Sequence, residues 1–176
     1  MSNLESETVK RVRQALTDAG LPDTVREFPD SVRNAAEAAS ALGVEHGAIV
    51  KTLVYTVGNR YVLALVAGDH LCNEDQLGRA LNLEGAVVRP TADLVRAVTG
   101  FAMSGPCGGV SPVGGVSTLP VAIDASLKRF DTVYAAAGHS RCVFETSMDV
   151  LKHLTKGVVS YAIAKDAKDE KEGPQS

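Results

Sequence analysis

Two strongly apolar runs constrain this chain more than any other feature: residues 49–57 and residues 60–67 are separated only by the dipeptide Gly58-Asn59. Both residues of this dipeptide accept a positive φ, which a two-residue hairpin turn requires. Each run has the length of a β-strand and is rich in Val, Leu and Ile. The segment 49–67 therefore predicts a β-hairpin and a fold that must bury both of its strands.

Helix-start and helix-stop signals surround this hairpin. Asn34 and Glu37 form a capping pair that opens an Ala-rich helix ending at Gly43. Thr91 can cap a helix that Gly100 closes. Further helices are expected from near Ser2 to Gly20, at 73–81 and at 147–154, and further strands at 25–28, 86–89, 101–103, 119–124, 132–137, 142–144 and 158–164.

The order of these elements determines the expected fold class. Hairpins are mixed with helix crossovers, which is not the pattern of a doubly wound parallel sheet. The chain of 176 residues, 45% of them hydrophobic, is long enough for one packed domain. We expect a single α/β domain at residues 1–164, with a mixed, strongly curved, barrel-like β-sheet surrounded by helices. Residues 165–176, rich in Lys, Asp and Glu, predict a disordered charged tail.

Charge and cysteine content limit the partners that can be expected. The formal net charge of −3 gives no overall attraction for a polyanion, so an extended DNA duplex is not expected and a nucleic acid would be held by its end or by a local basic patch. The three cysteines lack CxxC spacing, no signal-like segment opens the sequence, and no apolar stretch is long enough for a membrane. We expect a cytoplasmic protein with no membrane partner and no metal site.

Lys51 breaks the apolar pattern of the first run. It is the only charged residue between positions 47 and 57, and strand alternation puts it on the same face as Ile49 and Leu53. A lysine among apolar neighbours loses hydration, a cost that an anionic or carbonyl partner can offset. Such a residue indicates either a binding site or a lysine whose ammonium reaches water at a strand edge.

The segment from Ser104 to Thr118 is the second unusual feature, with five Gly and two Pro in fifteen residues. Glycine permits close backbone approach to a ligand, and successive amide groups can form an anion-binding concavity. The pattern matches no nucleotide-binding motif. It is compatible with a ligand-binding loop or with a surface turn. Cys107 lies within it, but no neighbouring base that would make a nucleophile is visible in the sequence.

Two further residues follow predicted strands. His139 would sit at the rim of the sheet, where it could transfer a proton or simply hydrogen-bond a backbone carbonyl. Asp124 ends the strand at 119–124, and its carboxylate is expected to cap the following turn.

Several sequence segments together resemble the YbaK family, which is related to the editing domain of bacterial prolyl-tRNA synthetase. The order and spacing of these segments carry the resemblance, which spans roughly residues 25–164. They are A-A-E-A-A-S-A-L-G-V at 35–44, I-V-K-T-L-V at 49–54, T-G-F-A at 99–102, G-G-V-S-P-V-G at 108–114, L-P-V-A-I-D at 119–124 and A-G-H…V-F at 137–144.

The resemblance implies a YbaK-like fold and a trans-editing hydrolase that removes a small, wrong amino acid from tRNA, in particular tRNA for proline. Its partners would be the acceptor end of aminoacyl-tRNA and a cognate synthetase, and it implies no cofactor, no metal and no covalent intermediate. The implied site residues are Lys51, Gly108 and Pro112 as catalytic residues, and Gly109, Val110, Ser111, Gly114, His139 and Asn34 as substrate-binding residues.

The sequence departs from the family pattern at two places. The segment 103–107 adds about four residues before the glycine loop, and Asn34 stands where many relatives have Thr. Both changes put the specificity of the site in question. Two other functions stay open: a non-catalytic module that binds tRNA or a synthetase, and an esterase with Cys107 or a serine as nucleophile, although the G-x-S-x-G elbow is absent.

Overall fold

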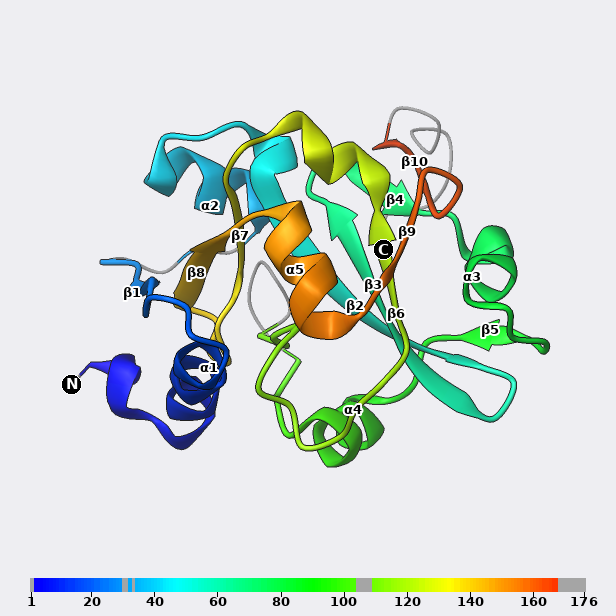
Figure 1. Ribbon diagram of the computed structural model, residues 1–176, viewed down its shortest axis with the longest axis horizontal. Coiled ribbons are helices and arrows are strands. Elements are labelled where there is room, and N and C mark those ends of the chain that lie inside the picture. Colours follow the sequence, from blue (N-terminus) through cyan, green and yellow to red (C-terminus); the bar gives the residue numbers. More distant parts are fainter. Residues whose placement is uncertain (1, 30–31, 33, 104–108, 168–176) are drawn as a thin grey trace.

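The computed structural model describes residues 2–29, 32, 34–103 and 109–167. The predicted hairpin is confirmed: β2 (Ile49–Val57) pairs antiparallel with β3 (Arg60–Ala67) over eight residue pairs, from Val57↔Arg60 to Val50↔Ala67. Gly58 in the turn has φ +58°, which suits a glycine. The hairpin runs through the middle of the molecule (Figure 1).

The sheet built on this hairpin is mixed, as expected. Its order is β1-β8-β7-β2-β3-β6-β9, and β5 also pairs with β2. The pairs β2/β7, β3/β6 and β6/β9 are parallel, whereas β1/β8 and β7/β8 are antiparallel. The further strands are β1 (Val25–Glu27), β4 (His70–Cys72), β5 (Val87–Val88), β6 (Val121–Asp124), β7 (Val133–Ala136), β8 (Cys142–Thr146), β9 (Val158–Ser160) and β10 (Ala164–Asp166).

The helices begin at the capping residues that the sequence indicates. Asn34 Oδ1 accepts from the Glu37 amide at 2.9 Å, Thr91 Oγ1 from the Leu94 amide, and Ser147 Oγ from the Val150 amide. The chain's first cap differs: Ser2 caps only a short 3-10 turn. The helices are α1 (Glu7–Asp18), α2 (Ala35–Leu42), α3 (Glu74–Leu81), α4 (Ala92–Thr99) and α5 (Met148–Thr155), with 3-10 turns η1 (Asn3–Glu5), η2 (His46–Ala48) and η3 (Ala125–Arg129).

Two strand predictions differ from the structure, and one strand was not predicted. Residues 101–103 form no strand, because Phe101 is fully buried against the main core and its backbone amide bonds to the Thr99 side chain. The strand expected at 158–164 is two separate strands, β9 and β10. The sequence analysis missed β4, which pairs with β10 in a second, two-stranded sheet. This pairing carries regular structure to Asp166, two residues beyond the domain boundary drawn at 164.

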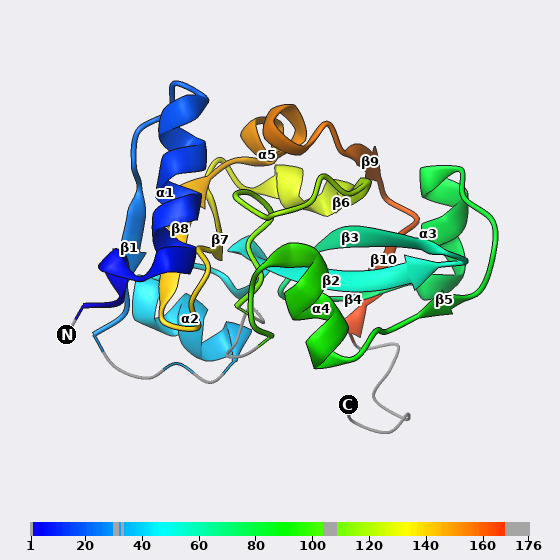
Figure 2. The ribbon, with the colours of Figure 1, turned by 90° about the horizontal axis from the view of Figure 1, so that it is seen from below.

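The two faces of the hairpin pack against different parts of the chain. Val50 and Val54 join the main core together with side chains of α1 and α5. On the other face, Ile49 packs with α2, and Tyr55 packs in a separate cluster with α3. Figure 2 shows α5 on one side of β2 and β3, and β4 and β10 on the other. The second face is therefore covered by two separate apolar clusters, and this division positions the candidate site.

Gly138 is a position where the fold requires glycine. Its φ is +92°, and an added Cβ would lie 2.8 Å from the Thr8 carbonyl oxygen in α1. We expect Gly138→Ala to destabilise the protein by roughly 1–3 kcal/mol for the backbone conformation, with a further steric cost from Thr8. Gly43→Ala is the matched control, because Gly43 has φ +69° and open space around it. Urea unfolding should show the larger loss for Gly138→Ala; equal losses would contradict the steric part.

Candidate functional site

Lys51 lies in the gap between the two apolar clusters on one face of β2. Ile49 belongs to the cluster around α2, Tyr55 to the cluster around α3, and Lys51 alternates with them on the same face. Its Nζ donates a hydrogen bond to the carbonyl oxygen of His70. Burial lowers the pKa of Lys51, while the negative charge of Asp69 acts in the opposite direction. Lys51 is thus a partly desolvated cation with a fixed backbone partner.

A cavity of about 430 Å³ opens next to Lys51. Side chains of β2, β4 and the first turn of α3 form its walls. The guanidinium of Arg89 lies 5.0 Å from the centre of the Tyr55 ring, a cation–π contact that holds Arg89 at this cavity. The described lining residues are Lys51, Leu53, Tyr55, Leu71, Cys72, Asn73, Glu74, Asp75, Arg89 and Lys165.

The backbone that accepts the Lys51 hydrogen bond is held by a polar network. His70 Nδ1 lies 2.9 Å from Asp124 Oδ2 and 3.0 Å from Ser126 Oγ. Asp124, only 1% exposed, also accepts from the Ala67 amide at 3.1 Å and from the Ser126 amide at 2.9 Å. The last of these bonds confirms the predicted turn cap. The bonds to Ala67 and His70 were not predicted, because both partners are distant in sequence.

The described part of the glycine loop, residues 109–118, has a buried half and an exposed half. Gly109, Val110, Ser111, Pro112 and Val113 are buried, whereas residues 115–118 are exposed. The two valines anchor the loop in the main core. Ser111 Oγ accepts from the Val113 amide at 3.2 Å, so this amide has an internal partner. Among the described loop residues, the surface-turn interpretation therefore applies only to 115–118.

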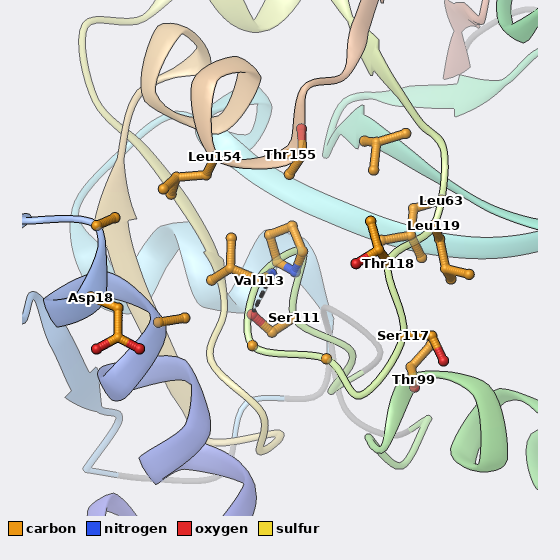
Figure 3. A pocket seen from close by; sticks show the side chains of 16 residues that line it. Asp18, Leu63, Thr99, Ser111, Val113, Ser117, Thr118, Leu119, Leu154 and Thr155 are labelled. Carbon is orange, nitrogen blue, oxygen red and sulfur yellow. Dashed lines mark hydrogen bonds between the residues drawn. The ribbon is translucent and has the colours of Figure 1, made fainter.

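The described part of the loop borders a second cavity, of about 480 Å³. Figure 3 shows Asp18 of α1, Leu154 and Thr155 of α5, and Leu63 of β3 around Ser111 and Val113. Pro112 and Gly114 also line this cavity. No sequence signal predicts this cavity, because its walls come from five separate segments of the chain.

Lys51 and the described loop residues therefore line different cavities. Val110 and Val113 belong to the same cluster as Val50 and Val54, whose side chains point away from the Lys51 face. Gly108 and Cys107 lie outside the described residues. A contact between Lys51 and the beginning of the loop at Gly108 remains a prediction.

His139 and Asn34 make local hydrogen bonds. His139 Nδ1 accepts from the Arg141 amide at 3.1 Å, and Asn34 Oδ1 caps α2. Neither residue is among those that line the two cavities. Their roles in substrate binding remain predictions.

Two cysteines lie in the described part of the chain. Cys142 is buried, and Cys72 lines the Lys51 cavity. Burial raises the pKa of the Cys72 thiol, which favours the protonated form and disfavours a nucleophilic thiolate. The described residues contain no cluster of three or more His, Cys, Asp or Glu that could hold a metal, and none of their helices is long and apolar enough to span a membrane.

Comparison with known proteins identifies the family. The family model for the aminoacyl-tRNA editing domain matches residues 29–154. The crystal structure of a candidate trans-editing enzyme for prolyl tRNA synthetase superposes with a TM-score of 0.82 at 36% identity, covering 92% of this chain and 99% of that one.

Two curated relatives by sequence support the same family assignment. EbsC of Enterococcus faecalis, a candidate Cys-tRNA(Pro)/Cys-tRNA(Cys) deacylase, is 29% identical over 70% of this chain and 73% of its own. Proline–tRNA ligase of Fervidobacterium nodosum is 32% identical over 58% of this chain and 17% of its own. The family resemblance and the mixed α/β fold expected from the sequence are confirmed, and the chain belongs to the aminoacyl-tRNA editing domain family.

Proposed function

We propose that this chain acts in trans and hydrolyses the ester of tRNA that carries a wrong, small amino acid, with tRNA for proline as its tRNA. Membership of the editing family confirms the prediction of an aminoacyl-tRNA deacylase. The observation that carries the finer proposal is Lys51, a partly desolvated cation on the wall of a 430 Å³ cavity. A buried cation of this kind is stabilised when a ligand brings negative charge to it.

The chemistry requires a positioned water and stabilisation of a developing oxyanion. Water attacks the ester carbonyl, negative charge collects on the carbonyl oxygen, and the ribose oxygen leaves with a proton. The ammonium of Lys51 supplies a positive charge at a partly buried position, where its effect exceeds that in bulk water. The amides of Gly108 and Gly109 are the further donors that we propose, since Val113 already donates to Ser111. Gly109 has φ +72°, a backbone conformation that favours glycine.

The size of the amino acid is the second part of the proposal. Pockets distinguish side chains weakly, by about 1–3 kcal/mol per methylene, so a synthetase for one small amino acid accepts others at a low rate. A separate hydrolytic site is the chemical remedy. The relative named for Cys-tRNA(Pro) supports a small residue on tRNA for proline. We include alanyl, seryl, threonyl, cysteinyl and 2-aminobutyryl esters among the substrates.

Recognition of the tRNA is proposed to be confined to its acceptor end. The net charge of −3 does not attract a long duplex, and phosphate contacts require clustered cations. The prolyl-tRNA synthetase relatives support a synthetase as a further partner.

The alternative is a non-catalytic module that binds the tRNA end or a synthetase. A panel of mischarged tRNAs distinguishes the two functions, with loss of the aminoacyl label as the readout. We expect the protein to release at least one small amino acid from tRNA for proline well above the spontaneous rate. Binding without accelerated release across the whole panel would favour the binding module and reject the deacylase.

The dependence of the deacylation rate on pH should reveal the loss of the proton from the Lys51 ammonium. Its protonated form is the one that attracts negative charge, and burial lowers its pKa below the ordinary value of 10.5. As the pH rises through this lowered pKa, the ammonium is lost and the enzymatic rate should fall. The rate must be corrected for spontaneous ester hydrolysis, which rises with pH. A corrected rate that keeps rising to pH 10.5 would contradict a role for the ammonium.

A further inference from the structure

Arg11 of α1 holds the backbone on both sides of the buried part of the glycine loop. Its Nε donates to the carbonyl oxygen of Gly114 at 3.1 Å, and its Nη2 donates to the carbonyl oxygen of Gly100 at 2.9 Å. A guanidinium presents its donors in a fixed planar geometry, so one side chain fixes two backbone positions relative to each other. Gly100 lies before the buried residues 109–113, and Gly114 follows them directly. Arg11 therefore joins the two ends of this segment.

Two further features fix the guanidinium in this place. Its Cζ lies 5.0 Å from the centre of the ring of Phe101, a fully buried side chain of the main core. Gly100 and Gly114, the residues whose carbonyls it binds, both have φ +80°. An added Cβ would lie 2.5 Å from Arg11 Nη2 at Gly100, and 3.0 Å from the Arg11 carbonyl oxygen at Gly114. Because both residues are glycines, their backbone contacts α1 directly.

Arg13, two residues later in the same helix, makes contacts of a different kind. It forms ion pairs with Glu5 at 2.8 Å and with Asp23 at 2.7 Å, both exposed to solvent. The described partners of Arg11 are instead two backbone carbonyls and an aromatic ring. A charged donor forms stronger hydrogen bonds to carbonyls than an uncharged donor does. The contrast indicates that the charge of Arg11 serves the loop, whereas that of Arg13 serves the helix surface.

We propose that Arg11 is a positioning residue of the deacylase, which holds the glycine loop so that the Gly109 amide can donate to the ester carbonyl. This inference rests on the proposed function. Arg11 itself lines neither the Lys51 cavity nor the cavity beside Ser111, so it acts through the loop. It also lies outside residues 29–154, which match the family model, so family membership assigns it no role. Donors to an oxyanion must lie within about 3.1 Å of it, and a displacement of about 1 Å can lower a rate about 100-fold.

Single-turnover deacylation of mischarged tRNA for proline, measured up to saturating enzyme, tests this role. Arg11→Ala should lower the plateau rate constant by about 10- to 100-fold, because the loop donor is no longer held in place. A merely structural defect would instead leave the plateau unchanged and raise the half-saturating enzyme concentration, because fewer molecules are active. Arg13→Ala is the matched control: it removes an arginine from the same helix without touching the loop, and it should keep the plateau of the parent. Arg11→Lys keeps the charge but not the planar fork, so its plateau should lie between those of the parent and Arg11→Ala.

Hydrogen exchange of the backbone amides at residues 109–118 gives a second readout that does not depend on turnover. Exchange should be faster in Arg11→Ala than in the parent, and unchanged in Arg13→Ala. Exchange at the parent's rate in Arg11→Ala would contradict the contact on which the inference is built.

The outcomes separate this inference from the function on which it rests. An active parent and an unchanged plateau in Arg11→Ala overturn the positioning role alone, as does an equal fall of the plateau in Arg13→Ala. If Arg11→Ala does not fold, Arg11→Lys decides: a lowered plateau supports the role, and the plateau of the parent overturns it. A parent that releases no amino acid from any mischarged tRNA rejects the deacylase itself, and the positioning role with it.

Discussion

Lys51→Ala should lower kcat/KM for deacylation by about two to three orders of magnitude, the range for removing one group that stabilises an oxyanion. The ammonium lies on the wall of the cavity, and its partial burial reduces the screening by water of its attraction to a developing negative charge. Single-turnover hydrolysis of mischarged tRNA for proline checks the expected loss. Lys152→Ala is the control, because Lys152 is an exposed lysine on α5 and its removal should leave the rate unchanged. Equal hydrolysis by Lys51→Ala and the parent would remove Lys51 from the mechanism.

A second substitution at Lys51 separates loss of function from loss of fold. Burial lowers the pKa of Lys51, which means that the folded state disfavours its charged form. At any pH below the ordinary lysine value of 10.5, the folded state therefore loses stability through the charge that this lysine carries in the unfolded state. Lys51→Met keeps much of the side-chain volume and removes the charge, so it should raise the urea midpoint while abolishing activity. An inactive and less stable Lys51→Met protein would indicate a structural role instead.

The local parts of the fold were predictable because their signals are local. The hairpin follows from Gly58-Asn59 between two apolar runs, and the helix starts follow from side chains that bond amides three residues ahead. β4 could not be found in this way, because its three residues gain strand structure only by pairing with β10, more than ninety positions later. The prediction of a strand at 101–103 was wrong because the apolar residue Phe101 is buried in the core although its segment does not pair with a strand.

The candidate site was predictable only in part. Alternation along β2 indicated a charged residue on an apolar face, and the structure confirms that Lys51 is partly buried there. The hydrogen-bond partner of Lys51 is the backbone carbonyl of His70. A backbone partner cannot be predicted from the pattern of side chains. For the glycine loop, composition left a ligand-binding loop and a surface turn open, and the structure shows that residues 109–113 are buried, with Val110 and Val113 in the main core. Two valines among many glycines were decisive, since each buried apolar side chain contributes about 1.5–3 kcal/mol.

Asp124→Ala should have the largest effect on stability. Its carboxylate, almost fully buried, accepts from the amides of Ala67 and Ser126 and contacts the His70 ring. Removing a buried charged acceptor leaves these donors without a partner, and we expect a loss of roughly 3–5 kcal/mol in the free energy of unfolding. Urea denaturation checks this value. Asp131→Ala, at an exposed aspartate, should change it little, by about 0.5 kcal/mol or less.

The expected loss for Asp124 follows from where its partners lie. Ala67 ends β3, His70 begins β4 and Ser126 lies in η3, so one carboxylate joins the start of η3 to the connection between β3 and β4, which is more than fifty residues away in sequence. Asp124→Asn should lose less, because its amide oxygen can still accept from Ala67 while its NH₂ group cannot accept from Ser126. Ser126→Ala removes only the hydroxyl contact to His70 and should lose least. If all three variants lost the same free energy, the network would not act through the buried acceptor, and a general packing defect around β6 would be the better explanation.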